Sequence, residues 1–138
     1  MLVKINRDSG IPLIGAIQFG IIDRGSNLLQ IRPTTLCNLR CTFCSTRAGE
    51  HDTDFEIDVN YLLDWIKEAV KVKGDNLIAF IESVGETLAY PKIIDLVSGI
   101  KKIKEFKEII LMTNGILLTK EKIRELKKAG VDKINLSI

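Results

Sequence analysis

Short apolar runs typical of strands alternate along this chain with segments whose apolar residues follow a helical period. The strand-like runs cover residues 77–82, 108–112 and 133–138. A helical pattern separates each pair of runs, and such alternation is typical of βα units that build a parallel sheet. The pattern therefore predicts an α/β fold.

Three helices are predicted from their caps and apolar stripes. The first follows Asp58 as its cap, the second begins near Pro91, and the third has Thr119 as its cap and Gly130 as its stop. The stripes expected to face the core are Val59, Leu62, Leu63, Ile66, Ala69 and Val70, then Ile93, Leu96, Val97, Ile100 and Ile103, and finally Ile123 and Leu126.

The N-terminal part predicts a β-hairpin. Ile17, Phe19 and Ile21 would share one face of a strand, and residues 23–26 form a turn before a second strand that ends at Arg32. We expect residues 1–27 to form a hairpin extension that caps the edge or bottom of the main domain, residues 28–138.

Composition excludes some classes of function. With 46% hydrophobic residues the chain can build a core, yet no apolar run reaches the roughly 18 residues that span a bilayer. Twenty basic and eighteen acidic residues leave a net charge of +2, which does not indicate a nucleic-acid partner. We expect a cytoplasmic protein without a membrane partner.

An irregular connection of about 25 residues joins Arg32 to Asp58, which is longer than usual between a strand and a helix. It follows the carboxyl end of a strand, where α/β folds place their chemistry. All three cysteines of the chain lie in it: Cys37, Cys41 and Cys44. An odd number of clustered cysteines does not fit a disulfide framework and indicates a reduced metal site.

Two kinds of metal site fit these residues. Three thiolates spaced CxxxCxxC, with no fourth cysteine, would leave one iron of a [4Fe–4S] cluster free to bind another ligand. Alternatively, His51 completes a Cys3His zinc site, although zinc motifs usually pair cysteines as CxxC. Arg40 and Arg47 either soften the charge of a thiolate-bound cluster or are exposed loop cations.

A strand followed by CxxxCx(aromatic)C in a long loop resembles the radical S-adenosylmethionine (radical SAM) superfamily. The resemblance implies that the three cysteines hold a [4Fe–4S] cluster whose fourth iron binds S-adenosylmethionine. It implies reductive cleavage of this cofactor to a 5′-deoxyadenosyl radical, with the protein supplying position and electrostatics. It also implies that Phe43, before the last cysteine, lies beside the adenine.

The next strand end resembles a second landmark of the family. Residues 84–87, Val-Gly-Glu-Thr, stand where the family has GGEP. Gly85 and Glu86 match, and the resemblance implies that they bind the amino group of S-adenosylmethionine. Val84 lacks the conformational freedom of glycine, so we expect a turn of different shape.

Two later strand ends complete the resemblance. Thr113 and Asn114 begin a Thr-Asn-Gly turn like that of the family, and Ser137 lies on a strand whose serine reaches the polar end of the cofactor there. The residues implied to bind the cofactor are therefore Phe43, Gly85, Glu86, Thr113, Asn114 and Ser137.

The resemblance covers residues 28–138 and implies a partial TIM-like (βα)6 barrel. We expect the first four βα steps, ending within the fourth strand, and hence a fragment of an enzyme that acts on an unknown substrate. An electron donor such as a ferredoxin or flavodoxin is implied. Two other classes stay open: a zinc-binding structural module and a non-catalytic remnant of such an enzyme.

Overall fold

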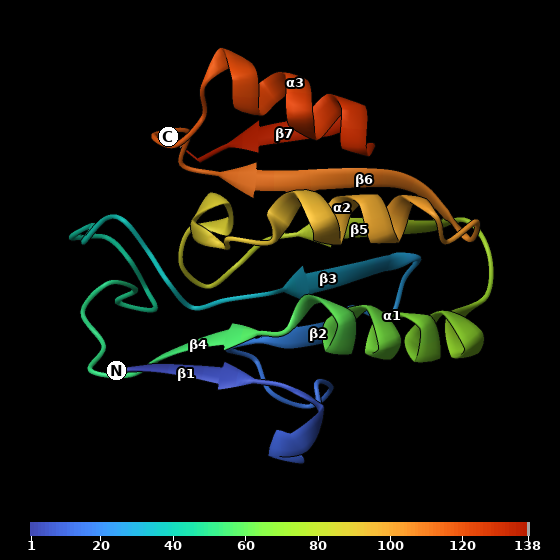
Figure 1. Ribbon diagram of the computed structural model, residues 1–138, viewed down its shortest axis with the longest axis horizontal. Helices are drawn as coiled ribbons and strands as arrows, with labels where there is room; N and C mark the ends of the chain where they lie inside the picture. The colour runs from blue at the N-terminus through green and yellow to red at the C-terminus, as the bar shows by residue number, and fades with distance from the viewer. Residues whose placement is uncertain (138) are drawn as a thin grey trace.

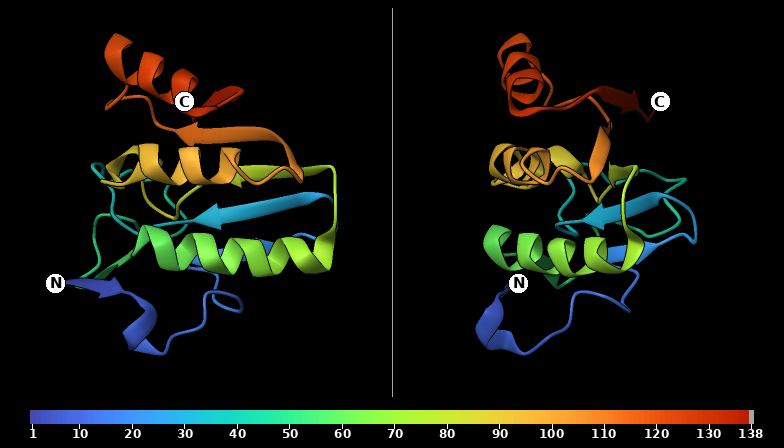
Figure 2. Two further views of the ribbon diagram at one scale, coloured as in Figure 1. Left: turned by 45° about the vertical axis from the view of Figure 1, so that its right-hand side comes forward. Right: turned by 90° about the vertical axis from the view of Figure 1, so that its right-hand side faces the viewer.

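A five-stranded sheet with helices on one face forms the centre of the computed structural model, which describes residues 1–137 (Figures 1 and 2). The strand order is β2-β3-β5-β6-β7; β2 is antiparallel to β3, and the other four strands are parallel to one another. The strands span Gly20–Asp23 (β2), Leu28–Arg32 (β3), Leu77–Ile81 (β5), Phe106–Thr113 (β6) and Lys133–Leu136 (β7). This arrangement confirms an α/β fold with a parallel sheet.

The three predicted helices are present. They are α1 (Val59–Lys73), α2 (Ile93–Lys101) and α3 (Lys120–Ala129). The Asp58 side chain caps α1 by accepting a hydrogen bond from the Tyr61 N–H at 3.0 Å. Thr119 caps α3 in the same way, and Gly130 ends it. Both predicted caps are confirmed, whereas α2 begins two residues after Pro91.

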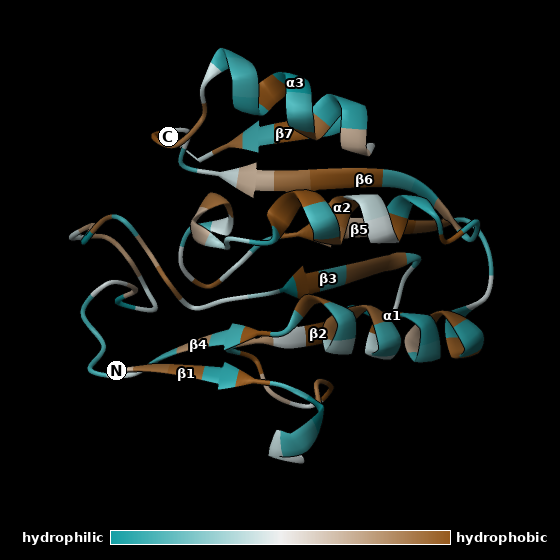
Figure 3. Ribbon diagram, viewed as in Figure 1, coloured by the Kyte–Doolittle hydropathy of each residue, from teal (hydrophilic) through white to brown (hydrophobic). Residues whose placement is uncertain are grey.

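The core lies between the helices and one face of the sheet. Alternate strand residues such as Leu29, Ile81 and Leu111 are buried beneath apolar helix residues such as Leu62 and Ile100. The middle strands are largely apolar, whereas α3 is mostly hydrophilic (Figure 3). The remaining strand residues point to the opposite face, which no helix covers (Figure 2).

Two predicted positions differ in the structure: Ile17, expected to share a strand face with Phe19 and Ile21, and Ile123, expected to face the core, are both exposed. Ile17 is 69% exposed because the chain bends there, and β2 begins only at Gly20. A Cβ atom at Gly20 would lie 2.2 Å from the Leu13 carbonyl oxygen, so a sharp glycine turn precedes the strand. Ile123 is 43% exposed because α3 covers the outermost strand, β7, with a single buried contact residue, Leu126.

A second, two-stranded sheet was not predicted. Strand β1 (Leu2–Ile5) pairs in parallel with β4 (Asp54–Ile57), within the segment predicted to be irregular. The Thr35 N–H donates to the Phe55 carbonyl at 2.9 Å, so β4 also contacts the chain just after β3. The long connection is therefore fixed at both ends, and only its middle part is irregular.

Two short 3-10 helices complete the fold, η1 (Arg7–Ser9) and η2 (Thr87–Ala89). The predicted hairpin is confirmed by β2 and β3, and β2 forms one edge of the main sheet. Ile138, the end of the predicted fourth strand, lies outside the described residues. Within residues 1–137, no helix combines the length and apolar character needed to cross a bilayer.

Candidate cofactor site at the carboxyl ends of the strands

The residues predicted from the sequence to form the site lie around one cavity of about 360 Å³. The cavity lies at the carboxyl ends of the parallel strands, on the side to which the cysteine loop extends (Figure 1). Its lining includes Cys37, Cys41, Phe43, Cys44, Gly85, Glu86, Thr113, Asn114 and Ser137. The fold therefore brings together residues that are up to a hundred positions apart, while their roles stay predictions.

The cysteine loop is built from successive tight turns. The Cys44 N–H donates to the Cys41 carbonyl at 3.1 Å, and the Arg47 N–H donates to the Cys44 carbonyl at 3.4 Å. All three thiols are free and partly exposed. Within residues 1–137, no three Cys, His, Asp or Glu side chains already stand together as a metal site. The loop thus directs the thiols to one cavity without placing them at a common point.

The thiols of Cys37 and Cys44 differ in their environment. The Thr46 hydroxyl, 3.2 Å from the Cys44 sulfur, lowers the pKa of Cys44, and the backbone N–H of Ala48 lowers it further. Burial raises the pKa of Cys37, and the nearby Glu86 carboxylate adds to this rise. Because the thiolate is the form that binds metals, Cys44 is the better prepared of these two.

The other candidate ligand in this loop, His51, interacts with the loop backbone. His51 is exposed and does not line the cavity; its Nε2 lies 2.7 Å from the Thr46 carbonyl oxygen. The Nε–H of Arg40 donates to the Gly49 carbonyl at 3.1 Å. Arg47 lies 3.5 Å from Glu50 in an exposed ion pair. These three side chains interact with the loop itself.

The turn after β5 packs against the chain just before the first cysteine. A Cβ atom at Gly85 would lie 2.0 Å from the Leu36 carbonyl oxygen, so only glycine fits this close approach. The Glu86 N–H donates to the same oxygen at 2.7 Å. Arg47 and Asn76 are the only described non-glycine residues with positive φ. Val84 is therefore not strained, and the turn needs no glycine at that position.

The Glu86 carboxylate is buried, with 2% of the residue exposed, and it connects two strand ends. One oxygen accepts from the Leu88 N–H at 3.0 Å and from the Thr113 hydroxyl; the other accepts from the Asn114 N–H at 2.8 Å. Glu86 was predicted to bind the cofactor. In the structure its carboxylate holds the turn after β6 in place.

Asn114 continues this network to the cysteine loop. Its side-chain N–H donates to the Asn38 side-chain oxygen at 2.8 Å, and its own oxygen accepts from the Ile116 N–H at 3.0 Å. The Ser137 N–H donates to the Thr113 carbonyl at 2.9 Å, which ties the end of β7 to β6. Hydrogen bonds therefore link the cysteine loop to three strand ends.

Several polar residues at the cavity were missed by the sequence analysis. Arg32, Glu82 and Ser83 line it, and Gln30, 2% exposed, lies behind Glu82. The Gln30 side-chain N–H donates to Glu82 at 2.7 Å, and its oxygen accepts from Arg24 at 2.8 Å. A polar residue within the apolar strand 28–32 is the signal that would have drawn attention to this face.

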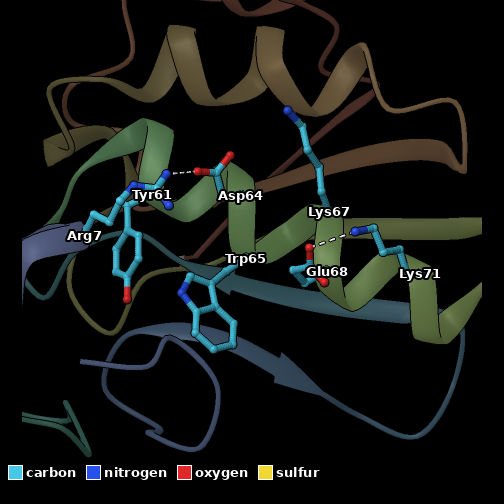
Figure 4. A pocket seen from close by; sticks show the side chains of 7 residues that line it. All are labelled: Arg7, Tyr61, Asp64, Trp65, Lys67, Glu68 and Lys71. Atoms are coloured by element: carbon cyan, nitrogen blue, oxygen red, sulfur yellow. Dashed lines mark hydrogen bonds and ion pairs between the residues drawn. The ribbon is translucent and has the colours of Figure 1, made fainter. Parts of the chain in front are cut away.

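A second hollow, of about 390 Å³, lies on the outer surface of α1 (Figure 4). Arg7 forms an ion pair with Asp64 there and lies 5.8 Å from the centre of the Tyr61 ring. None of the predicted site residues lines this hollow. We therefore take the cysteine cavity as the candidate site, because it is lined by the thiols and by buried polar groups, although the hollow on α1 is slightly larger.

Comparisons with known proteins agree with the fold and with the family resemblance of the sequence. The family model described as the Radical SAM superfamily matches residues 31–138. An uncharacterized protein of Methanocaldococcus jannaschii is 41% identical over an alignment of 135 positions, and the match covers 93% of this chain and 31% of that protein. A GTP 3',8-cyclase of Clostridium perfringens is 37% identical over 116 residues, which are 83% of this chain and 35% of the cyclase.

One solved structure has the same fold. The crystal structure of BtrN in complex with AdoMet and 2-DOIA matches with a TM-score of 0.70 and 19% identity, covering 83% of this chain and 46% of that one. The chain spans about a third of the length of the curated relatives named above. The family match over most of the chain shows that it belongs to the radical SAM superfamily, a family of enzymes.

Proposed function

We propose that this chain carries the cluster-binding and cofactor-binding part of a radical SAM enzyme. It would support reductive cleavage of S-adenosylmethionine to a 5′-deoxyadenosyl radical, which takes hydrogen from a substrate. The observation that carries the proposal is that three free thiols line the same cavity as the turns at three strand ends. The family membership gives this arrangement its chemical meaning.

The residues present fit a [4Fe–4S] cluster and S-adenosylmethionine. Thiolates are the ligands of such clusters, and three of them leave one iron for a further ligand. The cavity of about 360 Å³ is in the range of small-molecule sites. The cluster, when bound, would supply the single electron that breaks the carbon–sulfur bond of the cofactor.

The chain's own residues would bind and orient these groups. Cys37, Cys41 and Cys44 would hold the irons. Phe43, 80% exposed at the cavity, offers a ring face to the adenine, and the backbone at Gly85 offers polar groups to the amino group. Ser137, also at the cavity, would bind the polar end of the cofactor.

The family resemblance assigns Glu86, Thr113 and Asn114 to cofactor binding. We propose a different main role for their side chains. Their mutual hydrogen bonds hold the strand ends at fixed positions around the cavity. Asn114 also holds Asn38, between the first two cysteines. We therefore propose that these side chains mainly position the loops that carry the ligands.

The parallel sheet with its outer helices supports a larger architecture. We propose that strands β3, β5, β6 and β7 are the first four strands of a TIM-like barrel, with the cavity at its mouth. A ferredoxin or flavodoxin would supply electrons. The cyclase relative is named for its action on GTP, but this chain matches only about a third of the length of that enzyme. The proposal therefore concerns the cofactor part and no particular substrate.

Anaerobic reconstitution with iron and sulfide tests the proposal. The chain should gain about four irons and a brown [4Fe–4S] spectrum, and replacing any of the three cysteines by Ala should abolish it. S-adenosylmethionine should then perturb the electron paramagnetic resonance signal of the reduced protein. Ser45→Ala, in the same loop and also at the cavity, is the matched control and should keep the iron.

Replacement of His51 distinguishes the iron–sulfur cluster from the alternative Cys3His zinc site. His51→Ala should leave the iron content unchanged, because His51 does not line the cavity and its Nε2 interacts with the Thr46 carbonyl. Iron at background, together with one tightly bound zinc that is lost in His51→Ala, would establish a zinc module and overturn the proposal.

A further inference from the structure

Two contacts tie the cysteine loop to a single turn, the one that follows β5 (residues 82–86). Ahead of the first cysteine, the Leu36 carbonyl accepts a hydrogen bond from the Glu86 N–H at 2.7 Å. After the last cysteine, the Thr46 hydroxyl donates to the Val84 carbonyl, with 3.5 Å between the two oxygens. The three cysteines, at positions 37, 41 and 44, lie between these two contacts. The segment that carries the thiols is therefore held to the same turn at both of its ends.

Thr46 also contacts the last of these cysteines directly. Its hydroxyl oxygen lies 3.2 Å from the Cys44 sulfur, which is closer than the Val84 carbonyl. Its own carbonyl oxygen lies 2.7 Å from the Nε2 of His51, so the main chain of Thr46 is held as well. Within residues 1–137, no other side chain forms a hydrogen bond with a cysteine sulfur. Thr46 lines the cavity and joins a candidate metal ligand to a strand end.

The hydroxyl of Thr46 carries one proton and has two acceptors within reach. While Cys44 is a thiol, its S–H can donate to the Thr46 oxygen, and the hydroxyl proton is free for the Val84 carbonyl. A cysteine that ligates a metal does so as a thiolate and has no proton to donate. The sulfur is then a charged acceptor, and hydrogen bonds to charged acceptors are the stronger ones. Metal binding at Cys44 therefore turns the Thr46 proton from the carbonyl to the sulfur.

We propose that Thr46 is a positioning residue for the cluster site, whose hydroxyl holds the Cys44 thiolate and connects it to the turn after β5. The inference rests on the proposed function, because it concerns the same cysteines. Hydrogen bonds to the sulfurs are among the factors that set the reduction potential of an iron–sulfur cluster. A donor to the sulfur stabilises the extra negative charge of the reduced state. Thr46 therefore makes a cluster held by Cys44 easier to reduce.

The reduction potential of the reconstituted cluster tests this role. Thr46→Val removes the hydroxyl and keeps the branched shape, so it should lower the equilibrium constant of reduction about tenfold, or about 59 mV for one electron. Thr46→Ser keeps the hydroxyl and should retain the potential of the unaltered chain. Thr42→Val is the matched control, because Thr42 is exposed in the same loop and does not line the cavity. Equal potentials in Thr46→Val and the unaltered chain overturn the hydrogen bond to the sulfur.

The iron-free chain provides a second measurement, which needs no cluster. Thr46→Val should shift the ¹⁵N amide signal of Gly85, which shares a peptide group with the Val84 carbonyl, and Thr42→Val should not. An unmoved Gly85 signal overturns the connection to the turn, and it decides the case if Thr46→Val fails to load iron. The iron content of the unaltered chain is measured first. Iron at background contradicts the proposed function and this role with it, whereas iron with equal potentials contradicts the role of Thr46 alone.

Discussion

The Glu86 carboxylate lies between the ends of β5 and β6, where it accepts hydrogen bonds from Leu88, Thr113 and Asn114. A buried carboxylate is stable only when its oxygens are satisfied, and here backbone and side-chain donors satisfy both. The adjacent Gly85 allows the Leu36 backbone, just before Cys37, to approach closely. Two neighbouring residues therefore set the distance between the cysteine loop and the strand ends.

Replacement of Glu86 by Gln should destabilise the protein even without cluster or cofactor. One carboxylate oxygen becomes an N–H2 group that cannot accept a hydrogen bond, so a buried donor loses its partner. We expect the free energy of unfolding in urea to fall by about 1–3 kcal/mol. Glu82→Gln, at a half-buried carboxylate with a single Gln30 contact, is the matched control. Equal and small effects of both substitutions would contradict a positioning role for Glu86.

Among the helices and strands, those marked by a local sequence pattern were predicted, whereas strand β4, which pairs with a distant part of the chain, was missed. The starts of helices α1 and α3 were predicted to the residue because their caps, Asp58 and Thr119, are adjacent in sequence. Strand β4 was missed because its partner, β1, lies about 50 residues away and both have only four residues. Pairing over such a distance leaves no local pattern.

The candidate site shows the same division. Its cysteines and strand-end turns were found because they form short motifs at recognisable places in the βα order. Arg32 and Ser83, each with a buried side-chain atom that has no hydrogen-bond partner among the described residues, were missed because such an atom becomes visible only when every neighbour is known. The hydrogen bonds of Glu86 were missed for the same reason: Thr113 and Asn114, at the end of β6, lie far along the chain.

Tyr90 connects the region before α2 to β4, and it provides a test at this scale. Its hydroxyl donates to the Ile57 carbonyl at 2.6 Å, and the residue is 1% exposed. Tyr90→Phe should lower the free energy of unfolding by about 1 kcal/mol at pH 7. The measurement is urea unfolding followed by circular dichroism.

The same residue predicts a dependence on alkaline pH. Burial raises the pKa of Tyr90, so the unfolded chain loses the phenolic proton first, at about pH 10. The stabilisation is therefore complete below that pH and decreases as the pH rises above it. Tyr90→Phe should remove this contribution to the alkaline slope. Equal slopes in both proteins would show that Tyr90 does not cause it.

For the whole molecule, the two edges of the main sheet differ in their protection. At one edge, the antiparallel strand β2 is preceded by a sharp turn, and its Ile21 N–H donates to the Leu13 carbonyl at 2.7 Å. At the other edge, β7 presents Leu136, 54% exposed, beside α3, whose Ile123 is also exposed. Unpaired backbone groups next to apolar side chains favour pairing with another chain. The β7 edge is therefore the surface most prone to self-association in the described residues.

The β7 edge predicts concentration-dependent association of the 138-residue chain. In sedimentation experiments at about 100 µM, the mean mass should exceed the 15.5 kDa of one chain. Leu136→Lys should restore a mass near one chain, because charge on an edge strand opposes pairing between chains. Val72→Lys, at an 87% exposed position on α1, makes the same change away from any sheet edge and should associate like the unaltered chain. If Leu136→Lys and Val72→Lys reduce association equally, general charge repulsion is the cause. A monomeric unaltered chain at that concentration would show that the edge is already protected.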